Sequence, residues 1–183
     1  MRFQFTLLLL FFLCLTATVQ KVNAQKTAHF GAGYILMGTG DMSGLVIDTE
    51  LDFELSRRFS VGGGLAFAKT DSGVFEQASF FRLNSLLHYT PFGNATRNRF
   101  RLAAGPAFYS VSDVRLVSSE TVNGVLVDAD HVFESRTAFG WNFAVEDDLV
   151  VSKRLLLGLK LFFESYASGD VNVGALVRVG YRL

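Results

Sequence analysis

Cysteine and proline are nearly absent from this sequence, which has one Cys and two Pro among 183 residues. The single Cys14 has no partner within the chain, so an internal disulfide framework is excluded. An excess of basic charge is missing too, since 17 Lys and Arg residues stand against 17 Asp and Glu residues. We therefore expect no nucleic-acid partner.

Long hydrophobic runs are also scarce, and the main one is FTLLLLFFLCLTA at residues 5–17. It follows Arg2 and precedes a Val-Asn-Ala sequence ending at Ala24, which is typical of a secretory signal peptide and its cleavage site. The sequence predicts a cleaved signal peptide at 1–24 and one domain at 25–183. No later stretch approaches the roughly 18 to 20 apolar residues of a membrane-spanning helix. The exported chain is therefore either soluble or crosses a membrane without helices.

Phenylalanine and glycine are abundant, with 19 and 17 residues respectively. Apolar residues recur at every second position in segment after segment, and no stretch of ten residues after the leader has a helical period. This pattern indicates β-strands. The predicted strands span 28–38, 45–55, 59–69, 78–90, 99–110, 136–150, 155–165 and 171–183.

The predicted connections alternate in length. Short polar turns at 56–58, 91–98 and 152–154 alternate with longer segments at 70–77 and 111–135. Short turns at one end and longer loops at the other are typical of an up-and-down membrane barrel. The longest loop contains an Asn-Gly pair between β-branched residues, so it has the sequence of a hairpin.

Each predicted strand has one bulky apolar face and one small or charged face. In strand 59–69 the bulky face includes Phe59, Leu65 and Phe67, whereas the opposite face contains only Ser, Gly and Ala. A soluble lipocalin-like barrel would place the apolar face inside. However, an eight-stranded barrel has an interior that a few side chains fill, and the bulky set would overfill it. The apolar face is therefore expected to point outward, toward lipid.

Aromatic residues gather toward the two ends of the predicted strands, as in the aromatic girdles of transmembrane barrels. The sequence thus predicts an all-β fold, an eight-stranded antiparallel up-and-down transmembrane β-barrel. The predicted girdle residues are Phe53, Phe59, Tyr89, Phe100 and Tyr181 at the short-turn end, and Phe67, Phe81, Phe108, Phe139, Trp141 and Phe163 at the long-loop end.

Strand 45–55 carries four acids at alternate positions on its predicted inner face. Neighbours on one face lie about 6.6 to 6.8 Å apart, so the four cannot chelate one ion together. Buried charges are costly unless they are paired, which predicts an ionic network across the lumen. Three interpretations remain open: a plug that fills the barrel, a charged lining for a narrow ion path, and a metal or catalytic site. The predicted network comprises Asp48, Glu50, Asp52, Glu54, Arg82, Arg101, Lys160, Arg178 and Arg182.

No histidine has a serine at the spacing of a hydrolytic motif, so we expect neither an enzyme nor a cofactor or metal. Satisfied or solvated side chains are the preferred interpretation of His29, His88 and His131. Acidic residues in the longest loop are expected to be solvated, with a divalent cation or a partner as alternatives. These acids are Asp113, Glu120, Asp128 and Asp130.

The chain closes on VRVGYRL, in which Val179, Tyr181 and Leu183 alternate with other residues. Together with the strand pattern over 25–183, this resembles the small outer-membrane β-barrel proteins of Gram-negative bacteria, the OmpA/OmpX-like group. Leu183 stands where members usually end in Phe. The leader junction is similar to that of exported Bacteroidetes proteins.

The resemblance implies a location in the bacterial outer membrane and contact with outer-membrane lipid. It also implies recognition of the C-terminal strand by the barrel-assembly machinery. We expect a structural or surface-interaction role with a lumen filled by charged groups, and a possible surface ligand at 111–135. A narrow porin-like channel and a lipid-modifying outer-membrane enzyme are the alternatives.

Overall fold

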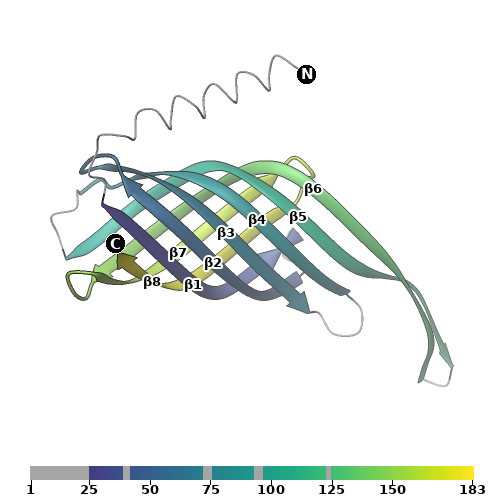
Figure 1. Cartoon of the computed structure of the whole chain (residues 1–183). Helices are drawn as coiled ribbons and strands as arrows, with labels where there is room; N and C mark the ends of the chain where they lie inside the picture. Colours follow the sequence, from purple (N-terminus) through teal and green to yellow (C-terminus); the bar gives the residue numbers. More distant parts are fainter. Residues whose placement is uncertain (1–24, 39–41, 72–75, 93–96, 123–124) are drawn as a thin grey trace, which may run out of the picture.

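The computed structural model describes residues 25–38, 42–71, 76–92, 97–122 and 125–183. These residues form eight strands that close into one antiparallel barrel in sequence order, with β1 beside β8 (Figure 1). The predicted eight-stranded barrel is confirmed, whereas the predicted signal peptide lies outside the described residues. The strands are β1 Lys26–Met37, β2 Met42–Glu54, β3 Phe59–Asp71, β4 Glu76–Tyr89, β5 Asn98–Val122, β6 Val125–Val150, β7 Leu155–Tyr166 and β8 Val171–Arg182.

No helix in the described part of the chain is long and apolar enough to cross a membrane.

The barrel wall is apolar on the outside, which inverts the usual arrangement of a soluble protein. In β7, buried and exposed residues alternate along the whole strand. Lys160 is fully buried, while its neighbours Leu159 and Leu161 are 59% and 57% exposed. Because successive side chains of a strand point to opposite faces, the two-residue period of the sequence places charged groups inside and aliphatic groups outside.

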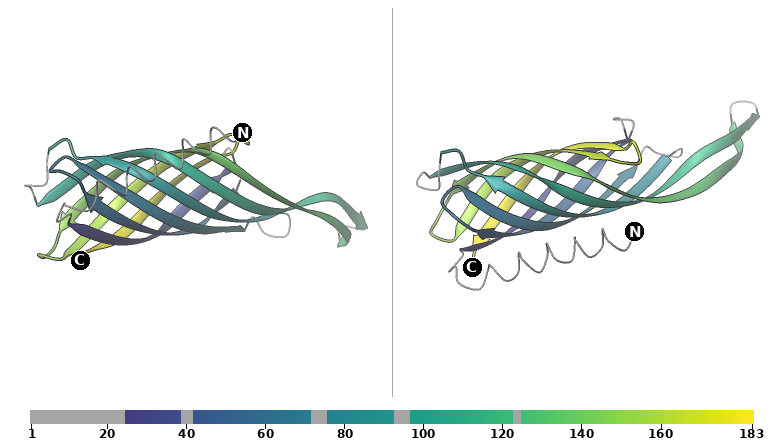
Figure 2. Two further views of the ribbon diagram at one scale, coloured as in Figure 1. Left: turned by 45° about the horizontal axis from the view of Figure 1, so that its top comes forward. Right: turned by 90° about the horizontal axis from the view of Figure 1, so that it is seen from above.

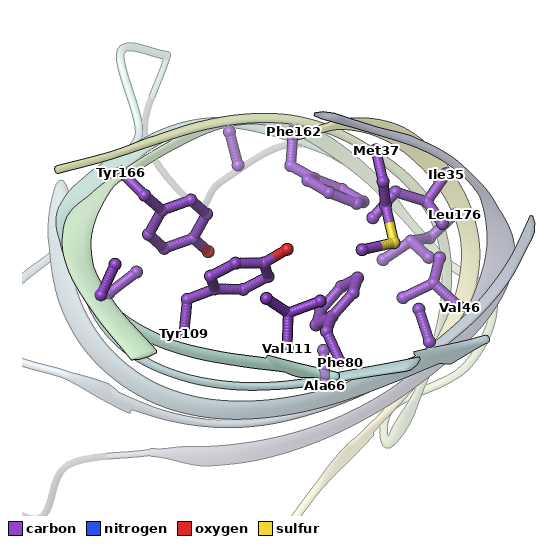
Figure 3. Close-up of a cluster of buried hydrophobic side chains, with 14 of the residues drawn as sticks. Ile35, Met37, Val46, Ala66, Phe80, Tyr109, Val111, Phe162, Tyr166 and Leu176 are labelled. Carbon is purple, nitrogen blue, oxygen red and sulfur yellow. The ribbon is translucent and has the colours of Figure 1, made fainter. Parts of the chain in front are cut away.

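The lumen also contains an apolar cluster, which the sequence interpretation of a small and charged interior missed. Large side chains such as Phe80, Phe162 and Leu176 fill the half of the barrel where β1 ends (Figure 3). Phe162 packs over Gly174, where a Cβ atom would meet the phenyl ring. Because Gly174 of β8 has no side chain, it leaves room for the phenyl ring of Phe162 of β7. A small residue thus faces a large one, as in a well-packed core.

β5 and β6 are much longer than predicted. The sequence interpretation ended and restarted them at 110 and 136, whereas the structure continues the pairing to Val122 opposite Val125. The other strands have 12 to 14 residues, and these two have 25 and 26. The two strands project well beyond the rest of the barrel as a twisted hairpin (Figure 2). The loop bounds were therefore wrong, whereas the hairpin expected within 111–135 is confirmed and extends the sheet.

Candidate functional site

Small residues on β3 make room for the acids of β2 to reach across the lumen. Asp52 lies opposite Gly62, and Glu50 lies opposite Gly64. A Cβ atom at Gly62 would meet Asp52 and would lie 2.9 Å from Cε1 of His88. The glycines of β3 therefore determine how close the charged side chains can approach the barrel wall.

The first part of the ionic network lies next to the apolar cluster. Arg82 of β4 forms ion pairs with Asp48 of β2 and Glu164 of β7, on opposite walls of the barrel. Asn142 donates from Nδ2 to Glu164 Oε1 at 2.8 Å, and the Tyr166 hydroxyl donates to Oε2 at 2.8 Å. Asn172 of β8 also donates from Nδ2 to Oε2 at 3.4 Å, so Glu164 has four donors from four strands.

The centre of the network joins β2 with β5, β6, β7 and β8. Lys160 donates from Nζ to Glu50 Oε2 at 2.6 Å. Glu146 of β6 lies between two guanidinium groups, with Arg178 Nη1 2.8 Å from Oε1 and Arg101 Nη2 2.8 Å from Oε2. Both carboxylates are buried at 4% exposure or less, so these contacts replace the water they have lost.

The remaining pairs lie toward the chain termini. Arg101 donates from Nη1 to Asp52 Oδ2 at 2.6 Å, and Arg178 donates from Nε to Asp148 Oδ1 at 2.9 Å. Arg99 pairs with Glu54. His29 of β1 lies with its Nε2 3.3 Å from Asp52 Oδ2, so every strand except β3 contributes a charged or imidazole side chain to the network.

The structure brings eight of the nine predicted network residues into such pairs. Arg182 differs, because it makes no ion pair within 4.0 Å with any described residue; it is only partly buried at the end of β8. Its position as the last residue of β8, at the rim of the barrel, keeps it near solvent. The sequence interpretation did not assign several members that follow from the inward parity of β1 and β4 to β7: His29, His88, Arg99, Asn142, Glu146, Asp148 and Glu164.

One group in the described part of the chain has the composition of a metal site, namely Glu50, His88 and Glu146. His88 Nε2 lies 3.3 Å from Glu50 Oε1 and 3.7 Å from Glu146 Oε2. Two carboxylates and an imidazole are common ligands of transition metals. However, Lys160 and Arg178 lie within 4.0 Å of both carboxylates, so a divalent ion would face strong repulsion. The group fits an ion-pair network better than a metal centre.

The mouth of the barrel at the hairpin end is crossed by Arg136. Its Nη1 lies 2.8 Å from Asp113 Oδ2, and its Nε and Nη2 each donate to Asp170 at 3.0 Å. This two-point hydrogen bond lowers the pKa of Asp170, which lies in the turn before β8. The side chains of the other acids predicted in this region, Glu120, Asp128 and Asp130, lie outside the described part of the structure, as does that of His131.

The predicted girdle residues all lie on outward positions of the wall. Phe59 and Tyr89 have ring centroids 5.3 Å apart, and Phe108 and Phe139 have centroids 5.2 Å apart at the other end. Exposed aromatic residues also occur in between, including Phe30 at 55% and Phe143 at 49% exposure. The sorting into two belts is therefore less complete than the sequence pattern indicated.

No protein-family model matches this chain, and no curated protein matches it. Solved structures do match in fold. Neisserial surface protein A matches with a TM-score of 0.65 and 10% identity, covering 88% of this chain and 98% of that chain. The attachment invasion locus protein Ail of Yersinia pestis, solved with the heparin analogue sucrose octasulfate, matches with a TM-score of 0.59 and 10% identity over 88% of this chain and 100% of that chain.

The outer membrane protein OprG from Pseudomonas aeruginosa matches with a TM-score of 0.58 and 10% identity, covering 87% of this chain and 96% of that chain. Each of these similarities extends over almost the full length of the solved protein. At this level of identity they show the fold alone. The chain thus has the eight-stranded barrel fold found in outer-membrane proteins.

Proposed function

We propose that the protein is an outer-membrane barrel with a structural and surface-interaction role, whose lumen is closed by its own side chains. The membrane location is supported by the exposed aliphatic wall, which would be a severe aggregation hazard in water. It is also supported by the shared fold with outer-membrane barrels. The closed lumen is supported by the buried ionic network and the apolar cluster stacked on it.

The projecting β5–β6 hairpin is the observation that carries the interaction role. β4 pairs with β5 only as far as Arg115, and β7 pairs with β6 only from Gly140 onward. Beyond these points the two strands pair only with each other. Each therefore presents an unpaired backbone edge, which is a template for an added strand.

An extended segment of a surface partner is the ligand that this edge fits best. Backbone N–H and C=O groups of an added strand would complete the hydrogen bonds of the free edge. Phe133, 82% exposed on β6, provides an apolar contact beside it. Within the described barrel wall all eight strands are paired on both sides. No comparable free backbone edge therefore occurs there.

A shortened hairpin tests this role. Removing 116–122 and 125–131 keeps the Asn-Gly pair as a two-residue turn between Arg115 and Val132, which lie opposite each other. Full-length protein in lipid nanodiscs should bind a subset of an immobilised array of extended peptides, and the shortened protein should bind none of them. Equal binding by both proteins, or no binding by the full-length protein, would contradict the proposal.

A narrow channel and a lipid-modifying enzyme are less well supported. A conducting path would have to pass the interlocked pairs around Glu146 and the apolar cluster beyond them. A lipid-modifying enzyme would need an accessible nucleophile or base at the outer rim. His29 and His88 are instead buried within the lumen at 5% exposure or less.

Export by a cleaved leader and insertion by the assembly machinery complete the proposal. β8 closes the barrel by pairing with β1, and its outward residues Val179 and Tyr181 are exposed along the wall. These alternating apolar residues supply the pattern expected of a C-terminal assembly signal. Replacing Tyr181 with Ala should lower the fraction of protein found in outer-membrane extracts, with Lys153→Ala in a neighbouring turn as the control. An unchanged fraction would contradict this assignment.

A further inference from the structure

A polar row crosses the outer wall beyond the girdle at the hairpin side of the barrel. Lys69 of β3 lies opposite Ser79 of β4, Ser79 opposite Ser112 of β5, and Ser112 opposite Ser135 of β6. All four are outward positions, because each lies an even number of residues from a girdle phenylalanine on its own strand. The row lies directly beyond the exposed apolar residues of the same strands.

The row lines a pocket of about 370 Å³. Gln77, Ala78, Val114 and Phe133 also line it, together with two acids, Glu134 and Asp113, the second of which is paired with Arg136. The Ser112 hydroxyl donates to Ser135 Oγ at 3.3 Å, so at least one hydroxyl lone pair and one proton of the pair stay available to a ligand. The volume is within the range of small-molecule sites, which begins at about 300 Å³.

The opposite wall of the barrel has no such row. At the same end of the barrel, the outward residues Leu36 of β1, Leu45 of β2 and Val173 of β8 are apolar and at least 41% exposed. Single outward serines do occur there, Ser43 of β2 and Ser165 of β7, but their paired neighbours Leu36, Trp141 and Val171 are apolar. Four polar residues in one paired row are described only on β3–β6. The change from apolar to polar side chains on this part of the wall indicates that it contacts a polar group and not the lipid tails.

We propose that this pocket binds the phosphorylated sugar headgroup of a membrane glycolipid. The inference rests on the proposed membrane location, since headgroups occupy the level just beyond an aromatic girdle. The serine hydroxyls both donate and accept, as sugar hydroxyls require. Lys69 is exposed and makes no ion pair within 4.0 Å with the described side chains, so its ammonium is available to a phosphate. Phe133 offers a flat apolar face to the sugar ring.

The site can be tested with lipid A as the probe glycolipid. The full chain is inserted into phosphatidylcholine nanodiscs containing increasing fractions of lipid A, and the lipid A retained per barrel is measured by native mass spectrometry. Ser112→Ala combined with Ser135→Ala removes two hydroxyls from the pocket. Ser165→Ala, an exposed outward serine on β7 outside the pocket, is the matched control.

The wild-type protein and Ser165→Ala should reach half-saturation at the same lipid A fraction. The double variant should require about tenfold more, as expected for the loss of two hydrogen bonds. Equal half-saturation for the double variant, or no enrichment of lipid A by the wild-type protein, would overturn the site alone. Failure of every protein to insert into lipid would overturn the membrane location and this site with it.

Discussion

At the scale of single residues, Glu146 has the most demanding environment in the barrel. It is fully buried and lies within 2.8 Å of both Arg101 and Arg178. Neither guanidinium can lose its charge by deprotonation, so each depends on nearby carboxylates. Without the negative charge of Glu146, two buried guanidinium groups would lose a paired carboxylate. Buried charges that are not fully paired are costly in the low-dielectric interior.

Glu146→Gln should therefore destabilise the barrel by about 3 to 5 kcal/mol. The measurement is urea unfolding in detergent micelles, followed by the change in electrophoretic mobility. Asp147→Asn changes the next residue of β6, which points outward and is exposed, and should cost less than about 0.5 kcal/mol. A loss for Glu146→Gln no greater than that of the control would contradict the network.

The Arg136–Asp170 contact makes a pH-dependent contribution. The hydrogen bonds from Arg136 hold the pKa of Asp170 below its ordinary value, so this contribution is fully present above about pH 4, the unfolded value. It is lost as the pH falls through the lowered folded-state pKa. The stability difference between the wild-type protein and Asp170→Asn should stay constant from about pH 7 to pH 5 and disappear near pH 2. A difference that persists at pH 2 would show that the carboxylate charge is not its source.

The charged residues of the lumen also show which parts of the network could be predicted from the sequence. The acids of β2 were identifiable because four of them alternate within one short strand. Glu146 belongs to the same parity class on β6, yet it is followed by Asp147 and Asp148, and this acidic run conceals the alternation. The partners were not predictable, because pairing across the lumen depends on which strands face each other in the closed barrel.

At the scale of elements, the hairpin formed by the ends of β5 and β6 is separable from the barrel wall. Its backbone pairs run from Leu116 opposite His131 to Val122 opposite Val125, without contact to a third strand. An element that packs against nothing else contributes little to the stability of the remaining structure.

Removing 116–122 and 125–131 should accordingly change the free energy of unfolding of the barrel by less than about 1 kcal/mol. The same urea titration in micelles measures this change. The prediction separates a surface role from a folding role, because a loss of several kcal/mol would mean that the hairpin supports the wall.

The strands within the wall were predictable and the hairpin was only partly so. Period-two alternation identifies a strand when one side meets an apolar medium and the other a packed lumen. Beyond Arg115 and Val132 neither side has such a partner, so the alternation fades although the backbone pairing continues. The Asn-Gly pair gave the remaining signal for a turn, and it lies outside the described residues.

At the scale of the whole molecule, the barrel consists of an apolar outer wall around a lumen with two kinds of filling. The ionic half joins seven of the eight strands, and the apolar half covers it toward the hairpin end. Water and ions would have to disrupt both to pass. The chain length and the alternation predicted the wall. The apolar half of the lumen was missed because its residues are distributed over all eight strands, among small and charged residues of the same face.

Conductance in planar lipid bilayers tests this closed-lumen account most directly. Purified full-length protein, inserted at a density verified by labelling, should produce no discrete current steps in concentrated KCl. The variant Glu146→Gln is measured beside it, because a weakened network is where residual openings would first appear. Frequent uniform current steps from the wild-type protein, altered in size by Glu146→Gln, would contradict the account and favour a narrow channel through the charged lumen.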